Sequence, residues 1–258
     1  MEIREYHNIN IRQKCNTYPK TLRIRLADYE VHVDDSYEDK DDMLLDLFKS
    51  ILSVERKYVL LTDKKTKAIQ VHLERVFAYE LYRQWSNRIQ ITHPNLVING
   101  EPEKSPKLFS KLFSKTHMYP DLVMHHDQGD EDFQGVVCEI KTSKVNSFNF
   151  KEDIEKLCCF VCGRKSKFRF DFGIFILVGC GISRIFEIME EIDGHTFKAS
   201  VKSRTKRIIC VAYDGECLQT VRFDWIISKK SRNQLRKDME RNGFVRSVEI
   251  NKSGYENI

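Results

Sequence analysis

Two acidic residues and a lysine occur within one short stretch of the chain, at a spacing that suits phosphate chemistry. Asp121 follows Pro120, and Glu139-Ile140-Lys141 comes 18 residues later. Paired carboxylates bind a hard divalent cation through oxygen, and such a cation lowers the pKa of a bound water and neutralises charge on a phosphate. A lysine beside them can position that water and stabilise the phosphoryl charge. The candidate catalytic residues are therefore Asp121, Glu139 and Lys141.

The pattern of an acid, any residue and a lysine carries little information by itself. Residues 38–40, 55–57 and 63–65 also match it, but all three triplets lie in polar stretches. Residues 139–141 instead end an apolar run, and the Pro-Asp pair upstream occurs nowhere else in the chain. This context favours a chemical site, while the alternative of a structural ion triplet on the surface stays open.

The two segments that carry these residues are expected to form a β-hairpin. Strands are predicted at 121–126 and 133–142, joined by a polar turn that contains glycine. Paired residues of an antiparallel hairpin have a constant index sum, which sets Asp121 opposite Glu139, although a β-bulge would shift this register. Alternation then places both acids and Lys141 on one face. The other face is apolar and consists of Leu122, Met124, Val136, Cys138 and Ile140.

A helix predicted over 66–88 adds a third acid, Glu80, which borders apolar surface. A charge in that position requires a partner. Glu80 can complete the candidate site, or it can be a boundary residue that faces water or pairs with Arg83 or Arg75. The mixed order of the remaining elements indicates an α/β or α+β domain. Strands are predicted at 22–26, 172–178, 208–213 and 218–223, and helices at 43–52, 150–161 and 182–192.

Composition narrows the class of protein. The 258 residues include 43 Lys and Arg against 38 Asp and Glu, and 41% are hydrophobic, which is typical of a soluble globular chain. The formal charge of +5 is compatible with a nucleic acid, an acidic protein or no partner. The longest apolar run, 172–182, has 11 residues, whereas a membrane helix needs about 20. The N-terminus lacks an apolar signal region, so the eight cysteines are expected to be reduced thiols in the cytoplasm.

With these residues in place, the chain resembles the PD-(D/E)XK nuclease superfamily. The core of that superfamily has the element order αβββαβ, and the predicted order over residues 66–180 is the same. The resemblance implies an α/β, restriction-endonuclease-like core, with a mixed central sheet flanked by helices. Residues 1–65 would be an N-terminal extension packed on that core. Residues 181–258 would be a C-terminal helix and strand extension with a basic tail, in the same domain.

The resemblance also implies roles for the matching residues. Asp121 and Glu139 would be metal ligands, with the backbone carbonyl of Ile140 as a third ligand, and Lys141 would orient or activate the attacking water. Glu80 matches the helix acid that many members use for a second metal ion. The implied metal is Mg²⁺, with Mn²⁺ as a substitute, and the implied reaction is phosphodiester hydrolysis.

Several polar residues near these positions are candidates for binding nucleic acid. Thr142, Ser143 and Lys144 directly follow the strand that carries Lys141, and Lys156 lies on the next predicted helix. The alternative is that they belong to an ordinary polar loop and a solvated helix face. Basic clusters at 164–169, 202–207 and 229–246 can form a positive surface for a phosphate backbone, or can be solvated loops. The candidates within the first two clusters are Lys165, Lys167, Arg204, Lys206 and Arg207.

A cysteine pattern follows the candidate site. Cys158, Cys159 and Cys162 form C-C-x-x-C, and some members of the superfamily carry an iron–sulfur cluster on four cysteines. Cys158 falls on the apolar stripe of its predicted helix, which indicates a packing role. A fourth ligand would have to come from a distant cysteine such as Cys15 or Cys180. Neither an iron–sulfur cluster nor zinc is therefore expected.

The sequence thus predicts a cytoplasmic, metal-dependent nuclease that cuts DNA in preference to RNA. A homodimer, or a separate specificity or motor subunit, is compatible with it, and restriction, defence and repair are equally open as processes. The competing interpretations are an RNA endonuclease on the same scaffold and a non-catalytic nucleic-acid-binding domain. A small α/β protein whose ion triplet is purely structural is the third.

Overall fold

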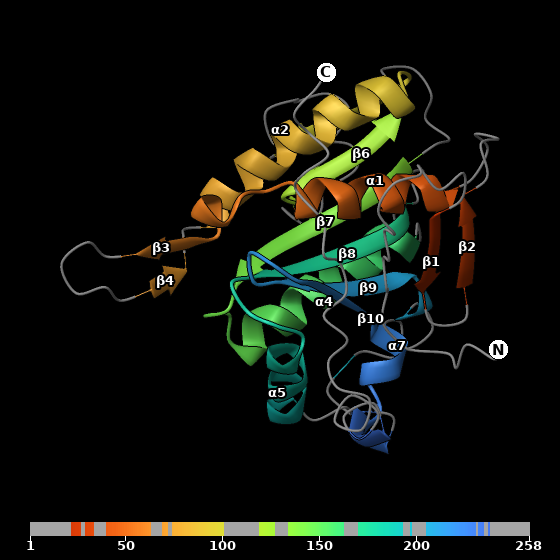
Figure 1. Cartoon of the computed structure of the whole chain (residues 1–258). Coiled ribbons are helices and arrows are strands. Elements are labelled where there is room, and N and C mark those ends of the chain that lie inside the picture. The colour runs from red at the N-terminus through yellow and green to blue at the C-terminus, as the bar shows by residue number, and fades with distance from the viewer. Residues whose placement is uncertain are drawn as a thin grey trace, which may run out of the picture.

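The computed structural model describes residues 22–26, 29–33, 40–62, 69–71, 74–100, 119–126, 134–162, 170–192, 197, 205–230, 232–234 and 237. Six strands form an open mixed sheet in the order β10-β9-β8-β7-β6-β5 (Figure 1). Strands β5, β6 and β7 are antiparallel, β7, β8 and β9 are parallel, and β10 is antiparallel to β9. The strands are β5 (Leu96–Gly100), β6 (Leu122–His126), β7 (Gln134–Thr142), β8 (Phe170–Val178), β9 (Ile208–Tyr213) and β10 (Leu218–Arg222).

Helices cover both faces of this sheet, so the fold is α/β with a buried sheet (Figure 1). Helices α1 (Lys40–Leu52) and α2 (Glu74–Thr92) pack on one face, whereas α4 (Ser147–Cys162), α5 (Ser183–Glu191) and α7 (Phe223–Ile226) pack on the other. Burial on both faces explains why β8 reads as a nearly continuous apolar run. Its side chains alternate between the two cores, with Ile174 and Ile176 in one and Phe175 and Leu177 in the other.

The predicted hairpin forms, and its predicted register is confirmed at the end that carries the candidate residues. Leu122 pairs with Cys138 and Met124 pairs with Val136, which is the constant index sum that the turn implied. The register shifts between Met124 and His125, where a bulge adds a residue beyond the candidate site. The apolar face expected of the hairpin packs against α1 and α2, and its opposite face is also apolar at Val123 and Val137.

The start of the helix predicted over 66–88 was wrong. Residues Ile69–Val71 form β4, which pairs with β3 (Leu60–Thr62), and α2 begins at Glu74 and extends to Thr92. Ile69 and Val71 are β-branched and alternate with a polar residue, a pattern that suits a strand better than a helix. The shift brings Glu74 into the first turn of the helix. The remaining helix and strand predictions within the described residues agree with the structure to within a few residues.

Two smaller features complete the description. Strands β1 (Leu22–Leu26) and β2 (Tyr29–Val33) form a separate antiparallel pair, and single 3₁₀ turns occur at η1 (Arg56–Tyr58) and η4 (Thr205–Arg207). Among the helices that the structure describes, none has the length and apolar character that crossing a membrane requires.

Close packing between α4 and the sheet brings helix residues beside β7. The chain passes from β7 to α4 through residues 143–146, and the side chain of Asn146 accepts a hydrogen bond of 2.8 Å from the backbone N–H of Asn149 in the first turn. Gly173 on β8 permits the approach, because a Cβ atom there would lie 3.2 Å from the Cβ of Leu157. Residues on the sheet-facing side of α4 therefore lie over the neighbouring strand β7.

Candidate active site

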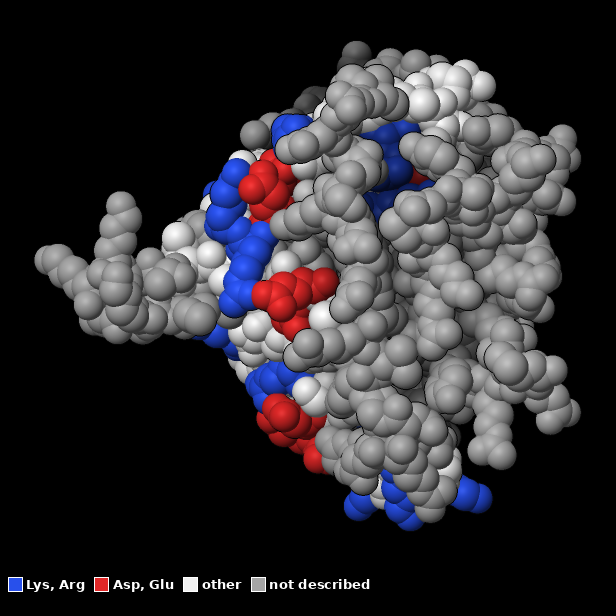
Figure 2. All heavy atoms as spheres, in the orientation of Figure 1, with Lys and Arg blue, Asp and Glu red and all other residues white. Residues whose placement is uncertain are grey.

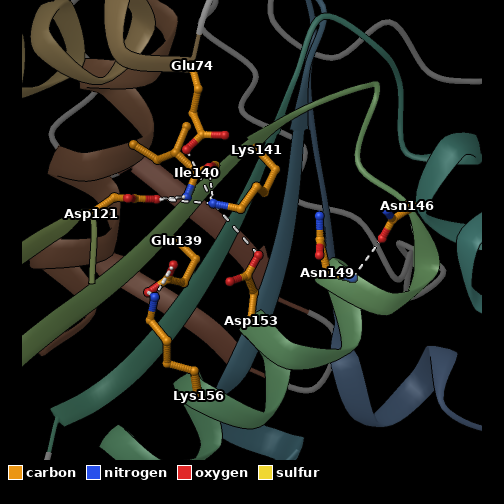
Figure 3. Close-up of polar contacts among 9 residues, drawn as sticks. All are labelled: Glu74, Asp121, Glu139, Ile140, Lys141, Asn146, Asn149, Asp153 and Lys156. Atoms are coloured by element: carbon orange, nitrogen blue, oxygen red, sulfur yellow. Dashed lines mark hydrogen bonds and ion pairs between the residues drawn. The ribbon is translucent and has the colours of Figure 1, made fainter. Parts of the chain in front are cut away.

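A cluster of four carboxylates and two lysines lies where β7, the start of β6, and the helices α2 and α4 meet (Figure 3). The three strand residues predicted from the sequence belong to it, together with three residues from the helices. We refer to it as the carboxylate–lysine cluster. It consists of Glu74 on α2, Asp121 just before β6, Glu139 and Lys141 on β7, and Asp153 and Lys156 on α4.

Lys141 lies among three of the carboxylates. Its Nζ donates hydrogen bonds to the carbonyl oxygen of Ile140 at 3.0 Å and to Oε1 of Glu74 at 3.2 Å. The same atom is 3.8 Å from Oδ2 of both Asp121 and Asp153. Burial lowers the pKa of Lys141, but the negative charges of Asp121, Asp153 and Glu74 outweigh burial and raise it above its usual value. Lys141 is therefore an ammonium ion at neutral pH.

Asp121 is fixed to the strand beside it by two hydrogen bonds. Its Oδ2 accepts a hydrogen bond of 2.7 Å from the backbone N–H of Ile140. Its own backbone N–H donates to the carbonyl oxygen of Cys138 at 3.1 Å. The carboxylate is thereby held at the level of Glu139 and Lys141 on β7, and 27% of the side chain remains exposed to solvent.

Glu139 is the most deeply buried member of the cluster, with 1% of its side chain exposed. Nζ of Lys156 is 2.8 Å from both of its carboxylate oxygens, forming an ion pair with Oε1 and a hydrogen bond to Oε2. Burial, followed by the negative charge of Asp121, raises the pKa of Glu139 well above its usual value, and Lys156 offsets this only in part. One lysine is thus not enough to satisfy the buried carboxylate.

The two acids contributed by the helices, Glu74 and Asp153, also have raised pKa values. Burial is the main cause that raises the pKa of Asp153 and of Glu74, and the charge of Asp121 raises both further, while Lys141 lowers both. Oδ2 of Asp153 is buried and has no hydrogen-bond donor within the described part of the chain. The raised pKa values of these three acids thus reflect burial first and the neighbouring charge of Asp121 second.

The donor set fits a hard divalent cation. All of the ligand atoms are carboxylate or carbonyl oxygens, as Mg²⁺ and Mn²⁺ prefer, and four carboxylates against two ammonium groups leave two negative charges uncompensated. The described His, Cys, Asp and Glu residues nevertheless form no group of three or more that is arranged to hold a metal ion. The ammonium group of Lys141 instead lies among three of the carboxylates, and that of Lys156 lies against Glu139 (Figure 3).

The structure does not bring Glu80 to the cluster. Its carboxylate accepts hydrogen bonds from Arg83, at 2.9 and 2.5 Å, and from Gln84 at 2.7 Å, which agrees with the alternative of a boundary residue paired with Arg83. Glu80 lies six residues after Glu74, which is about 9 Å further along the helix axis. The acid of α2 that reaches Lys141 is Glu74.

The residues after β7 have varied surroundings. Thr142 ends the strand, and Ser143 donates its backbone N–H to the carbonyl oxygen of Val178 at 3.0 Å. The carbonyl oxygen of Ser143 accepts a hydrogen bond of 3.4 Å from Arg184, and Lys144 is exposed. These residues follow the cluster directly in the chain, as predicted, but the two hydrogen bonds of Ser143 join it to β8 and α5 rather than to the cluster.

Two of the predicted basic residues, Lys206 and Arg207, lie away from the cluster. Lys206 and Arg207 belong to η4, before β9, and Arg207 lies 3.8 Å from Asp171. Ile208, the first residue of β9, pairs with Gly173 in the first half of β8, whereas Lys141 on β7 pairs with Leu177 near the end of β8. The turn η4, which precedes Ile208, therefore lies at the opposite end of the parallel strands from Lys141. On the face drawn in Figure 2, described basic and acidic side chains are interspersed. Three further candidates, Lys165, Lys167 and Arg204, lie outside the described residues.

The cysteine pattern agrees with a packing role at Cys158, which is buried in the core beneath α4, whereas Cys159 is exposed. The side chain of Cys162 and all of Cys15 lie outside the described residues.

Sequence reasoning missed Glu74 and Asp153. Asp153 immediately precedes Ile154 on the apolar stripe of α4, so it had the same signal that singled out Glu80, namely an acid bordering apolar surface. Glu74 gave no such signal, because its place in the first turn of the helix depends on where α2 begins.

In comparisons with known proteins, no family model matches the chain, and neither a curated protein nor a solved structure matches it. The chemistry of the carboxylate–lysine cluster therefore rests on its own geometry. That geometry gathers four carboxylates around two lysines, with Glu139 buried and with Glu74 and Asp121 partly exposed.

Proposed function

We propose that the chain is a metal-dependent nuclease of the PD-(D/E)XK type, which hydrolyses phosphodiester bonds with DNA as its favoured substrate. The observation that supports this most directly is that Asp121, Glu139 and Lys141 gather around one point on adjacent strands. The element order also agrees with the superfamily's αβββαβ core, since α2, β5, β6, β7, α4 and β8 follow one another within 66–180.

Four groups would hold the metal ion in this function. They are the carboxylates of Asp121 and Glu139, the carbonyl oxygen of Ile140, and Glu74, which takes the role first assigned to Glu80. Mg²⁺, or Mn²⁺ in its place, would supply a water of lowered pKa and a positive charge for the phosphate. Asp121 and Glu74 are the more exposed of these acids, at 27% and 36% of the side chain, so substrate would approach from their side.

Lys141 would act as a hydrogen-bond donor rather than as a proton acceptor. The carboxylates of Asp121, Asp153 and Glu74 raise its pKa, which favours the charged ammonium, and an ammonium has no lone pair with which to accept a proton. From a position near the rim it can orient the attacking water or stabilise negative charge on the phosphate oxygens. Glu74 and Asp153 hold the ammonium in place and are positioning residues for this role.

A cleavage assay on the full chain tests the proposal. Plasmid DNA and single-stranded DNA and RNA oligonucleotides are incubated with Mg²⁺ or Mn²⁺, and wild type is compared with Asp121→Asn and Lys141→Met. We expect either substitution to reduce the cleavage rate by about 10²–10⁴-fold, because each removes a group that acts on the reacting phosphate.

Glu152→Gln is the matched control, because Glu152 precedes Asp153 on α4 but lies outside the cluster, and it should cleave like wild type. If Asp121→Asn or Lys141→Met cleaves like wild type while folding normally, the assignment is wrong. Faster cleavage of RNA than of DNA would instead identify an RNA endonuclease. Salt-sensitive binding of DNA without cleavage would identify a non-catalytic binding domain.

A further inference from the structure

The carboxylate–lysine cluster has two places where a positive charge is surrounded by oxygen atoms. The outer place is bounded by the carbonyl of Ile140 and the carboxylates of Glu74 and Asp121, and Nζ of Lys141 lies within it. The inner place is at the carboxylate of Glu139, where Nζ of Lys156 is 2.8 Å from both oxygens. Figure 3 shows that the two lysines come from different elements, β7 and α4.

The two lysines differ in how well water could solvate their carboxylate partners if the lysine side chain moved away. The partners of Lys141 at the outer place reach solvent, since 36% of the Glu74 side chain and 27% of the Asp121 side chain are exposed. Water can therefore solvate these acids when Lys141 turns toward a substrate. Glu139 has 1% of its side chain exposed, so removal of Lys156 would leave a buried carboxylate without a counter-charge.

Lys156 and Asp153 lie three residues apart on α4 and therefore share the face of the helix that covers β7. Asp153 nevertheless turns its carboxylate toward the other lysine, because its Oδ2 is 3.8 Å from Nζ of Lys141. The inner place is formed by Glu139 alone, whose two oxygens both lie 2.8 Å from Nζ of Lys156. The cation at this buried carboxylate is thus part of the chain.

We propose that Lys156 is a built-in counter-cation that fills the inner place, so that the cluster binds one divalent metal ion rather than two. The inference rests on the proposed function. With Lys141 and Lys156 both charged, the four carboxylates leave two uncompensated negative charges, which one divalent ion neutralises. A second divalent ion would place excess positive charge in a site that is largely closed to water.

Lys156 would also hold the carboxylate of Glu139 in a fixed orientation, because its Nζ is 2.8 Å from both oxygens. Lys156 is in this sense a positioning residue, which acts on the metal through Glu139.

Binding of Mn²⁺ to the full chain, measured by isothermal titration calorimetry at pH 8, tests the proposal. Wild type is compared with Lys156→Met, with Lys156→Arg, which keeps the charge, and with Lys151→Met, which removes a lysine elsewhere on α4. We expect one Mn²⁺ per chain for wild type, Lys156→Arg and Lys151→Met. Lys156→Met should bind a second Mn²⁺, or bind one at least about tenfold more tightly, because a nearby positive charge has been removed.

Thermal unfolding with and without Mn²⁺ supplies a second measurement, which also serves if Lys156→Met is only marginally stable. The rise in Tm produced by Mn²⁺ should be larger for Lys156→Met than for wild type, and Lys156→Gln should show the same trend. If Lys156 only stabilises the fold, its loss lowers Tm equally with and without Mn²⁺.

The outcomes separate this inference from the proposed function. Two Mn²⁺ ions per wild-type chain, or a Lys156→Met variant that binds Mn²⁺ with the stoichiometry and affinity of wild type, would overturn the role of Lys156 alone. No binding of Mn²⁺ by wild type would overturn both.

Discussion

The middle of α2 and the end of β7 each bury a glutamate, and the two sites treat it in opposite ways. Glu80 has 7% of its side chain exposed and Glu139 has 1%. Hydrogen bonds from Arg83 lower the pKa of Glu80, with help from Gln84. Burial, followed by the charge of Asp121, raises the pKa of Glu139 well above its usual value. Burial of an acid therefore does not identify a functional site by itself.

The difference lies in where the partners come from. Arg83 and Gln84 are three and four residues from Glu80 on the same helix, so its charge is neutralised as soon as α2 forms. Glu139 obtains one lysine from α4, but the fold also brings it a like-charged neighbour from the start of β6. An acid that is satisfied locally stabilises its helix, whereas acids gathered from several elements depend on the counter-charges that the tertiary structure brings to them.

The largest expected effect is a difference in the rate of DNA cleavage between variants of Glu139 and of Glu80. Glu139→Gln should reduce the rate of metal-dependent DNA cleavage by about 10³-fold, because it weakens a ligand to the metal ion. Glu80→Gln should cleave at nearly the wild-type rate. Both variants are checked for folding by circular dichroism, and cleavage is measured with Mn²⁺ and plasmid DNA. Equal loss in the two variants would remove the distinction between the sites.

A smaller effect concerns the thermal stability of the protein when EDTA keeps divalent cations away from the cluster. The folded-state pKa of Asp153 is raised above its unfolded value, so the cost in stability grows as the pH rises from the unfolded pKa to the folded pKa, and it is absent below the unfolded pKa. Asp153→Asn should therefore raise Tm by roughly 2–4 °C at pH 8, and the gain should vanish as the pH falls below about 4. The measurement is thermal unfolding across this pH range. A gain that is independent of pH would contradict a raised pKa for Asp153.

The smallest effect is expected at Glu80, and it has the opposite dependence on pH. The pKa of this acid is lowered in the folded state, so its contribution to stability is present above its unfolded pKa and is lost as the pH falls through the folded value. Glu80→Gln should lower Tm by about 3 °C or less at pH 7, since more than half of the Arg83 side chain is exposed. Mn²⁺ should not change this difference. If Mn²⁺ does change the loss in Tm, Glu80 would have to be counted among the residues that hold the metal ion.

Local pattern was sufficient to predict the part of the site that lies on the hairpin. Apolar alternation and the position of the turn predicted the pairing of Leu122 with Cys138, and with it the approach of Asp121 to Glu139 and Lys141. The apolar stripe of α4 and the continuous apolar run of β8 were also readable, because both follow from periodicity within one segment. The place of Glu80 outside the cluster could not be predicted, because the helix period shows which residues border apolar surface but not which distant groups lie across from them.

The hairpin, its register and the common face of Asp121, Glu139 and Lys141 follow from local spacing, since they depend on neighbours within about 20 residues. That Glu74 rather than Glu80 reaches Lys141, that Asp153 also approaches Lys141, and that Lys156 pairs with Glu139 became visible only in the folded molecule. These contacts depend on where each helix sits on the sheet, which is set by packing between distant segments. The start of α2 depends on the strand pairing before it, and the depth of α4 depends on close contact at Gly173.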